Sequence, residues 1–252
     1  METIEHAPPK IMFIGSIRPK GLEVPSCERC NNGSSQQDQV AALFACTQLP
    51  ALMSGGTDRP NEFNHFKKLV NGVGNNSEIG PMFDLAPDIF IQVRGVIQRF
   101  KRLKIKPAAF SHYLYPWAAK QALSIWYEKT NTIFDANGSI TIFWMDPKTI
   151  NQSEKVRSFL AGLPDAGSLA QGKFNVDTQF SYRTGITDDK SMGVYWAVFH
   201  ETLTFVALLD TDATRATKLD RKAFKTSAVL RTNLENGIFI DSMGDISSNF
   251  IG

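Results

Sequence analysis

Two polar motifs in the first fifty residues restrict the fold of this chain more than any other feature. They read EHAPPK over residues 5–10 and VPSCERCNNG over residues 24–33. A glutamate beside a histidine, a Cys-x-x-Cys pair and an asparagine supply the carboxylate, imidazole, thiolate and amide groups that bind metal ions in proteins. Nothing later in the sequence is as specific. We therefore expect a small N-terminal module built around a metal site.

Short segments separated by turn-forming residues surround these motifs. Residues 10–14 and 21–25 are expected to be extended, with a turn over residues 15–19. Ser35 then suits a helix N-cap, and apolar residues recur at helical spacing over residues 40–44. The order of strand, turn, strand, cysteine pair and helix predicts a ββα unit.

The composition excludes several classes of protein. Of 252 residues, 42% are hydrophobic and 21% are charged, as in ordinary soluble globular proteins. The sequence has no apolar run of about eighteen residues and no signal-peptide core, so we expect a cytoplasmic protein with no membrane partner. Three cysteines are not the even set of a disulfide framework. The net charge of +2 does not by itself indicate a nucleic-acid partner.

The rest of the chain predicts a second, larger domain. Residues 54–83 are rich in Gly, Asn and Pro, which indicates a linker with at most one short helix. This linker separates residues 1–53 from a domain over residues 84–252. An apolar stripe at a period of 3.6 predicts a helix over residues 86–105, and Pro116 suits the first turn of the next helix.

Strands are expected to follow these helices. Their predicted ranges are 132–135, 139–145, 173–183, 192–200, 203–209 and 236–241. Alternating apolar and polar residues, with turn residues between the segments, favour hairpins. Adjacent strands after helices are typical of an α+β domain with an antiparallel sheet. The predicted fold class is therefore α+β, with a small ββα module joined to a larger domain of helices and an antiparallel sheet.

The N-terminal motifs resemble those of the HNH endonucleases of the ββα-metal type, and more narrowly those of a bacterial subgroup of that family. The resemblance rests on EHAPPK at residues 5–10, LEVPSCERCNNGSS at residues 22–35, and Asp38. It covers roughly residues 4–44 and identifies residues 1–53 as an HNH-like module. It implies a phosphodiesterase that cuts DNA with one divalent cation, Mg²⁺ or Mn²⁺.

The resemblance also implies roles for single residues. It assigns His6 as the general base that activates water, and Glu5 and Asn31 as ligands of the cation. Neighbouring side chains on a strand point to opposite sides, so the acid can face the cation while the imidazole faces the water. Two protein ligands suffice for Mg²⁺, which keeps several waters. Lys10 and Arg18 are implied contacts of the DNA phosphates.

Cys27 and Cys30 are implied ligands of a structural Zn²⁺ ion. A closed zinc site has four ligands, and family members supply the other two from a Cys-x-x-Cys upstream of the Glu-His pair. In this sequence Glu5 follows Met1 by four residues and no such pair precedes it, so the implied zinc site is incomplete. Either the module folds without zinc, or the chain is a fragment of a longer enzyme.

A second departure from the family concerns the orientation of His6. Many members place an asparagine immediately before the second strand, where it orients the histidine, whereas this chain has Lys20-Gly21 there. Two functional hypotheses therefore stand. One is a metal-dependent endonuclease that cuts DNA, and the other is a catalytically decayed HNH-derived protein that binds nucleic acid or another partner. The basic cluster over residues 94–106 fits either an approach to DNA or the solvated flank of a core helix.

The remaining histidines and the large aromatic residues are expected to be structural. His65, His112 and His200 have no partner at the spacing of metal ligands. Aromatic residues within periodic apolar runs are predicted to lie in the core, namely Trp117, Trp126, Tyr127, Trp144 and Trp196.

Overall fold

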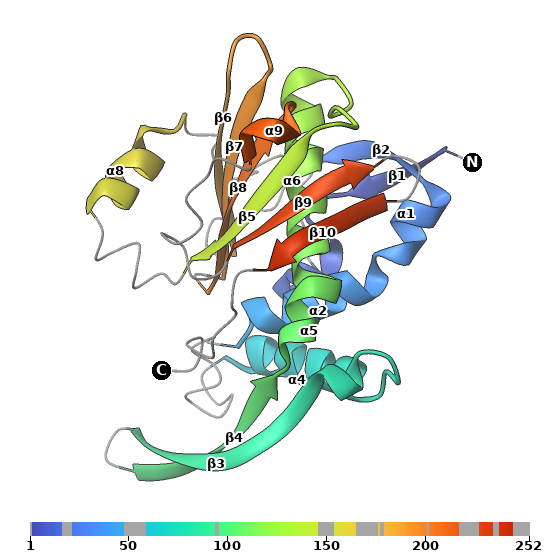
Figure 1. Cartoon of the computed structure of the whole chain (residues 1–252). Helices are drawn as coiled ribbons and strands as arrows, with labels where there is room; N and C mark the ends of the chain where they lie inside the picture. The colour runs from blue at the N-terminus through green and yellow to red at the C-terminus, as the bar shows by residue number, and fades with distance from the viewer. Residues whose placement is uncertain are drawn as a thin grey trace.

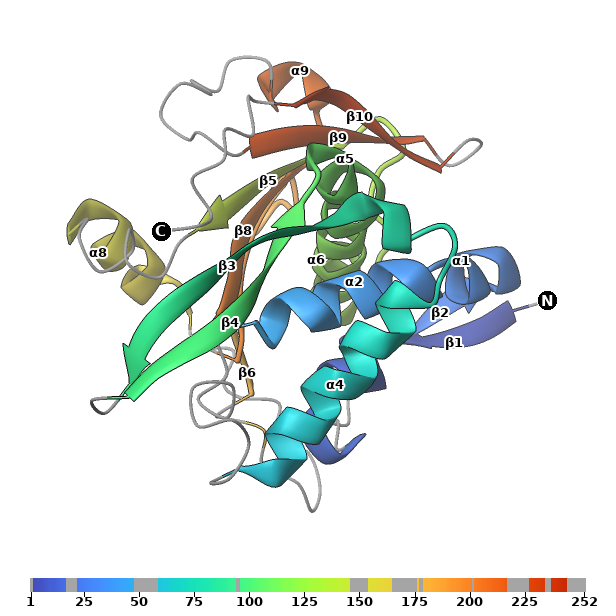
Figure 2. The ribbon, with the colours of Figure 1, turned by 90° about the horizontal axis from the view of Figure 1, so that it is seen from below.

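The computed structural model describes residues 2–16, 22–47, 59–93, 96–145, 154–164, 176, 179–200, 202–216, 227–233 and 237–243. Helices and antiparallel sheets form an α+β structure, as the sequence predicts (Figure 1). Helix α6 (Tyr115–Thr130) lies against one face of a six-stranded sheet, and a long two-stranded ribbon projects from the body (Figures 1 and 2). In the described part of the chain, no helix combines the length and the apolar character needed to cross a bilayer.

The N-terminal segment forms a hairpin followed by helices. Its elements are β1 (Glu2–His6), the 3-10 turns η1 (Lys10–Met12) and η2 (Ile14–Ser16), β2 (Glu23–Cys27), α1 (Glu28–Gly33) and α2 (Ser35–Ala45). Strands β1 and β2 pair antiparallel, with Glu5 opposite Val24 and His6 opposite Glu23. The predicted order of two strands and a helix is therefore present.

The first strand lies earlier than predicted, because residues 10–14 form 3-10 turns instead of an extended segment. Strand β1 ends at His6, since the Pro8-Pro9 pair after it lacks the N–H groups that a β-ladder needs. Met12 and Phe13 are fully buried. This segment therefore packs into the core and does not pair with β2.

A helix occupies half of the segment that the sequence indicates as a linker. Helix α4 (Pro60–Gly74) has fifteen residues and is longer than the short helix expected. Its Leu69 and Val73 are buried in the main core cluster. Within residues 54–83, the part over residues 60–74 is thus a packed element, because its apolar side chains recur at helical spacing.

The prediction of a helix over residues 86–105 is wrong. Strand β3 (Phe83–Val93) pairs antiparallel with β4 (Val96–Ile105) to form the ribbon. The apolar residues of this segment fit a period of two as well as a period of 3.6, and β-branched residues on both sides of Gly95 favour strands. Pro87 also disfavours a helix interior.

The long central helix is built from three consecutive segments. The 3-10 turn η3 (Gly80–Met82) precedes the ribbon, and α5 (Pro107–Ala109), the π-helical turn η4 (Phe110–Leu114) and α6 follow it. Pro116 lies in the first turn of α6, as predicted, because that position needs no backbone N–H. The helix ends at Asn131, whose φ of 51° is the left-handed conformation that commonly follows a helix.

The main sheet is antiparallel throughout, with the order β10-β9-β5-β8-β7-β6. Its strands are β5 (Ser139–Met145), β6 (Phe180–Ile186), β7 (Met192–Phe199), β8 (Leu203–Asp210), β9 (Ser227–Asn233) and β10 (Gly237–Met243). The predicted hairpin over residues 192–209 and the last strand are confirmed. Residues 132–135 are not a strand, because β8 and β9 occupy the two edges of β5. Two short helices, α8 (Glu154–Gly162) and α9 (Ala213–Ala216), complete the described elements.

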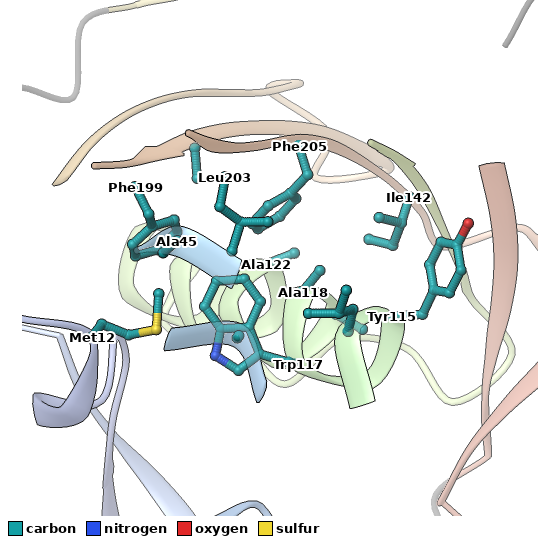
Figure 3. Close-up of a cluster of buried hydrophobic side chains, with 14 of the residues drawn as sticks. Met12, Ala45, Tyr115, Trp117, Ala118, Ala122, Ile142, Phe199, Leu203 and Phe205 are labelled. Carbon is teal, nitrogen blue, oxygen red and sulfur yellow. The ribbon is translucent and has the colours of Figure 1, made fainter. Parts of the chain in front are cut away.

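The core lies between α6 and the sheet (Figure 3). Trp117 is fully buried, and its ring centroid lies 5.1 Å from that of Phe199 and 5.7 Å from that of Phe205. Met12 and Ala45 of the N-terminal segment belong to the same buried cluster (Figure 3). Side chains of the predicted module and of the predicted larger domain therefore share one core. Of the other aromatic residues predicted to be core, Trp126 and Trp144 are buried, and Tyr127 and Trp196 are half-buried.

Candidate active site

Asn31 connects helix α1 to strand β1. Its Nδ2 donates hydrogen bonds to the backbone oxygen of Ile4, at 3.1 Å, and to Oγ1 of Thr3, at 3.3 Å. Thr3 and Glu5 are two residues apart on the strand, so their side chains share a face. The structure therefore places the carboxamide of Asn31 on the face of β1 that carries Glu5.

Glu5 is a buried carboxyl group with one uncompensated oxygen. Only 6% of the residue is exposed. Its Oε1 accepts a hydrogen bond from the backbone N–H of His6, at 3.2 Å, and lies 3.7 Å from Nζ of Lys120. Its Oε2 is buried without a hydrogen-bond partner among the described residues. Burial raises the pKa of Glu5, and the Lys120 charge opposes that rise.

Lys120 of α6 contacts both Glu5 and Asp38. Its Nζ donates to Oδ1 of Asp38 and to Oγ of Ser34, both at 2.9 Å. Ser34 in turn donates to the backbone oxygen of Asn31, at 3.1 Å. Burial raises the pKa of Asp38, while the Lys120 charge lowers it. One ammonium group therefore faces two buried carboxyl groups, so full ionisation leaves a net negative charge at the site.

The sequence analysis missed Lys120 because the residue is distant along the chain. Asp38 and Lys120 are separated by 82 residues, and Lys120 lies in a helix whose other features indicate only core packing. One sequence feature could have indicated it: Lys120 is the sole charged residue between Tyr115 and Trp126 of α6. A single charge within an apolar helix often has a buried partner.

His6 lies on the other side of β1 from Glu5, as the alternation of side chains predicts. Its imidazole Nδ1 is 3.5 Å from Oε1 of Glu23, the residue opposite it in the hairpin. The side chains of His6 and Glu23 are 37% and 52% exposed, so solvent reaches both. A base at this position is accessible to water and to a substrate.

Glu23 is a second residue that the sequence analysis missed. Family members orient the histidine with an asparagine before the second strand, whereas here a carboxylate from within β2 faces Nδ1. A carboxylate beside Nδ1 favours the tautomer with the proton on that nitrogen, which leaves Nε2 to accept a proton. The register of the hairpin, which pairs His6 with Glu23, would have identified this residue, but the sequence did not predict that register.

The other predicted site residues are not gathered around Glu5. Cys27 is exposed at the end of β2, and Lys10 is exposed in η1. Cys30 belongs to α1, but its side chain and the whole of Arg18 lie outside the described part of the structure. The described residues therefore do not complete a zinc site.

The carboxylate of Glu5 and the carboxamide of Asn31 provide the type of oxygen ligand that a hard divalent cation prefers. Glu5 contributes a buried carboxylate oxygen that no hydrogen bond satisfies, and Asn31 contributes a carboxamide on the same face. Mg²⁺ and Mn²⁺ prefer such oxygen ligands and take the remainder from water and phosphate. In the described chain, no three His, Cys, Asp or Glu side chains are grouped to hold a metal ion. Any cation here would thus have few protein ligands and would share Glu5 with Lys120.

The remaining histidines of the core fit the structural role expected of them. His200 is 7% exposed, and its Nε2 lies 2.6 Å from the backbone oxygen of Met12. His65 of α4 makes a hydrogen bond with the backbone of Ile11. Two histidines that are far apart in the sequence therefore both contact the backbone of η1. Burial lowers the pKa of each.

Comparisons with known proteins add no assignment to this geometry, because no family model, no curated protein and no solved structure matches the chain. The family resemblance of the N-terminal segment therefore rests on its motif residues alone.

Proposed function

We propose that the N-terminal hairpin and helix form a nuclease site that hydrolyses DNA phosphodiester bonds with one Mg²⁺ or Mn²⁺ ion. The observation that carries the proposal is the pair of hydrogen bonds from Asn31 to Thr3 and Ile4. These bonds bring the carboxamide to the strand face of Glu5, whose Oε2 lacks a hydrogen bond. The buried free thiol of Cys46 suits a reducing compartment, and we place the activity in the cytoplasm.

In this proposal each residue of the site has a separate task. Glu5 and Asn31 hold the cation, which when bound stabilises negative charge on the phosphate and the leaving oxygen. Glu23 orients the imidazole of His6, and Nε2 of His6 takes a proton from the attacking water. Lys120 opposes the rise in the pKa of Glu5 that burial causes, and so favours its charged form.

The test is the nicking of supercoiled plasmid DNA by the full chain. We expect cutting with Mg²⁺ or Mn²⁺ and none with EDTA. Loss of the general base in His6→Ala should slow cutting by roughly a hundredfold or more. His112→Ala is the matched control, because His112 is exposed on η4 and remote from the site in sequence. Undiminished cutting by His6→Ala would refute the role of His6.

A second candidate function is supported by the contact between Lys120 and Glu5. An ammonium group 3.7 Å from the carboxylate already supplies positive charge where a cation would bind. On this alternative the module is a decayed HNH unit that binds nucleic acid or another partner without cutting it. DNA binding by the folded chain, with no nicking in Mg²⁺, Mn²⁺ or other divalent ions, would select this candidate.

A further inference from the structure

The β3–β4 ribbon is the most isolated element in the described structure. Its two strands pair only with each other among the described sheets, and they extend away from the body (Figures 1 and 2). The ten residues of β4 span about 33 Å at roughly 3.3 Å per residue. The base is held by a hydrogen bond from Lys106 N to Met82 O, at 2.9 Å, and by Phe83 packing on Phe44. A two-stranded ribbon is barely stable in water by itself, so a partner along its length would stabilise it.

Positive charge is concentrated in this ribbon. Residues 83–105 contain five basic residues and two acidic residues, a net charge of +3, whereas the whole chain carries +2. The basic residues are Arg94, Arg99, Lys101, Arg102 and Lys104, and the acidic residues are Asp84 and Asp88. Four of the five basic residues belong to β4. The ribbon therefore favours a polyanionic partner.

Two large apolar side chains are exposed in the distal half of the ribbon. Phe90 is 68% exposed and Ile97 is 70% exposed. Phe90 lies opposite Arg99, and Ile97 lies opposite Gln92, two residues further along β3. Since residues two apart on a strand share a face, Phe90 and Ile97 lie on the same face of the ribbon. Apolar side chains of proteins contact the thymine methyl groups that lie in the major groove of DNA.

The curvature of the ribbon fits a groove. The register shifts between Ala86 and Ile89, where β3 has one more residue than β4. Such a bulge bends the strand and increases its right-handed twist, and the ribbon is curved in Figure 2. The major groove of B-form DNA is about 12 Å wide and admits a two-stranded ribbon, whereas the major groove of A-form RNA is too narrow.

We infer that the β3–β4 ribbon is a DNA-binding arm that enters the major groove of the B-form duplex. The basic residues of β4 neutralise phosphates, and Phe90 and Ile97 contact the bases. The choice of DNA as the partner rests on the proposed function, but binding by the arm needs neither His6 nor a cation. The ribbon is thus a recognition element separate from the cutting site.

The experiment measures binding of a short labelled duplex by fluorescence anisotropy, in EDTA and over a series of salt concentrations. For Arg99→Gln/Lys101→Gln, we expect the salt slope of log Kd to fall by about 1.8 and the affinity to fall roughly tenfold, since each phosphate contact contributes about 0.9 to the slope. For Phe90→Ser/Ile97→Ser, we expect weaker binding with the salt slope unchanged, because no charge is removed.

The matched control is Lys129→Gln/Arg157→Gln, which removes one lysine and one arginine that are exposed on α6 and α8. We expect this control variant to bind the DNA duplex as tightly as the wild-type chain does. We also expect the wild-type chain to bind double-stranded RNA more weakly than DNA, because the ribbon does not fit the major groove of A-form RNA. Circular dichroism and thermal unfolding check that each variant is folded. Equal binding by the ribbon variants and the control would overturn the inference.

Two further outcomes separate this inference from the nuclease proposal. A wild-type chain that binds the duplex through the ribbon but never nicks it would refute the nuclease and leave the arm intact. A chain that nicks DNA equally well with and without the ribbon substitutions would refute the arm alone. If Phe90→Ser/Ile97→Ser instead converts a dimer to a monomer in sedimentation and leaves DNA binding unchanged, the ribbon pairs with a second copy and the inference fails.

Discussion

Lys120 is the residue on which the charge balance of the N-terminal site depends. It contacts Asp38 at 2.9 Å and Glu5 at 3.7 Å, and all three side chains are largely buried. A buried ion pair adds little net stability compared with an apolar substitute, but removal of one partner leaves an uncompensated charge. The two carboxyl groups therefore tolerate burial only while the ammonium group is present.

We predict that Lys120→Met lowers the free energy of unfolding by about 3 kcal/mol at neutral pH, because Glu5 and Asp38 lose their counter-ion. The pKa values of both carboxyl groups are already raised by burial and would rise further. Where the carboxyl pKa values are higher in the folded state than in the unfolded chain, the folded state binds more protons between the two sets of values. The free energy of unfolding therefore falls as the pH rises through the folded-state pKa values. The deficit should shrink towards pH 5 in urea unfolding.

Lys129→Met is the control for this prediction, because Lys129 is an exposed lysine on the same helix. It should change the free energy of unfolding by less than about 0.5 kcal/mol. The triple variant with Glu5→Gln, Asp38→Asn and Lys120→Met should recover most of the loss, since no buried charge remains. Equal effects of the two single lysine substitutions would contradict the charge argument.

At the scale of elements, the β1–β2 hairpin determines which side chains can cooperate. Its register sets His6 opposite Glu23, and a slip by one residue would move every side chain of a strand to the other face. The same strand presents Glu5 inward to α6 and His6 outward to solvent. The hairpin thus separates a buried anion from an accessible base by a single peptide unit.

We predict that Glu23→Ala lowers kcat for DNA nicking by roughly ten- to a hundredfold with little change in KM, because the imidazole loses its orientation. Glu23→Gln should restore part of the rate, since its amide oxygen can accept a hydrogen bond from Nδ1 of His6. Glu28→Ala, a change at an exposed glutamate of α1, is the control. A Glu23→Ala variant that cuts at the wild-type rate would exclude a positioning role for Glu23.

At the scale of the whole molecule, half-buried His65 and buried His200 link distant parts of the chain. His65 comes from α4 and His200 from the connection between β7 and β8, and both hydrogen-bond to the backbone of η1. Burial lowers the pKa of each below its ordinary value of 6.5. Protonation of either group in the folded state would place a charge where three segments meet.

We predict that the free energy of unfolding falls as the pH drops below about 6.5. In that range the unfolded chain binds more protons than the folded chain, because the folded pKa values of His65 and His200 are lowered. Glu5 and Asp38 act in the opposite direction, so His200→Gln is needed to isolate the histidine contribution. This variant should reduce the loss between pH 7 and pH 5.5 in denaturant titrations, whereas His112→Gln should leave it unchanged. A drop of the same size in both variants would contradict the assignment.

Secondary structure was predicted correctly from the sequence where a single local pattern favoured one type of element. The hairpin of β7 and β8 is rich in β-branched and aromatic residues on both sides of a short connection, and Pro116 marks the start of α6. The ribbon was missed because its apolar residues satisfy two periods at once, and only pairing with a second strand distinguishes them. Similarly, Glu5 and Asn31 are site candidates because of their motif, whereas Lys120 is 82 residues from Asp38 and is brought there only by the packing of α6.

Helix α6 places Trp117 in the central core and Lys120 beside Glu5, one turn further along. Expression of residues 1–53 by themselves would therefore yield a peptide without the indole that shares a buried cluster with Met12 and without the ammonium group that faces Glu5 and Asp38. Failure of such an excised piece to fold or to cut DNA would say nothing about the intact chain. Any attempt to dissect this protein should keep α6 attached to its first strand.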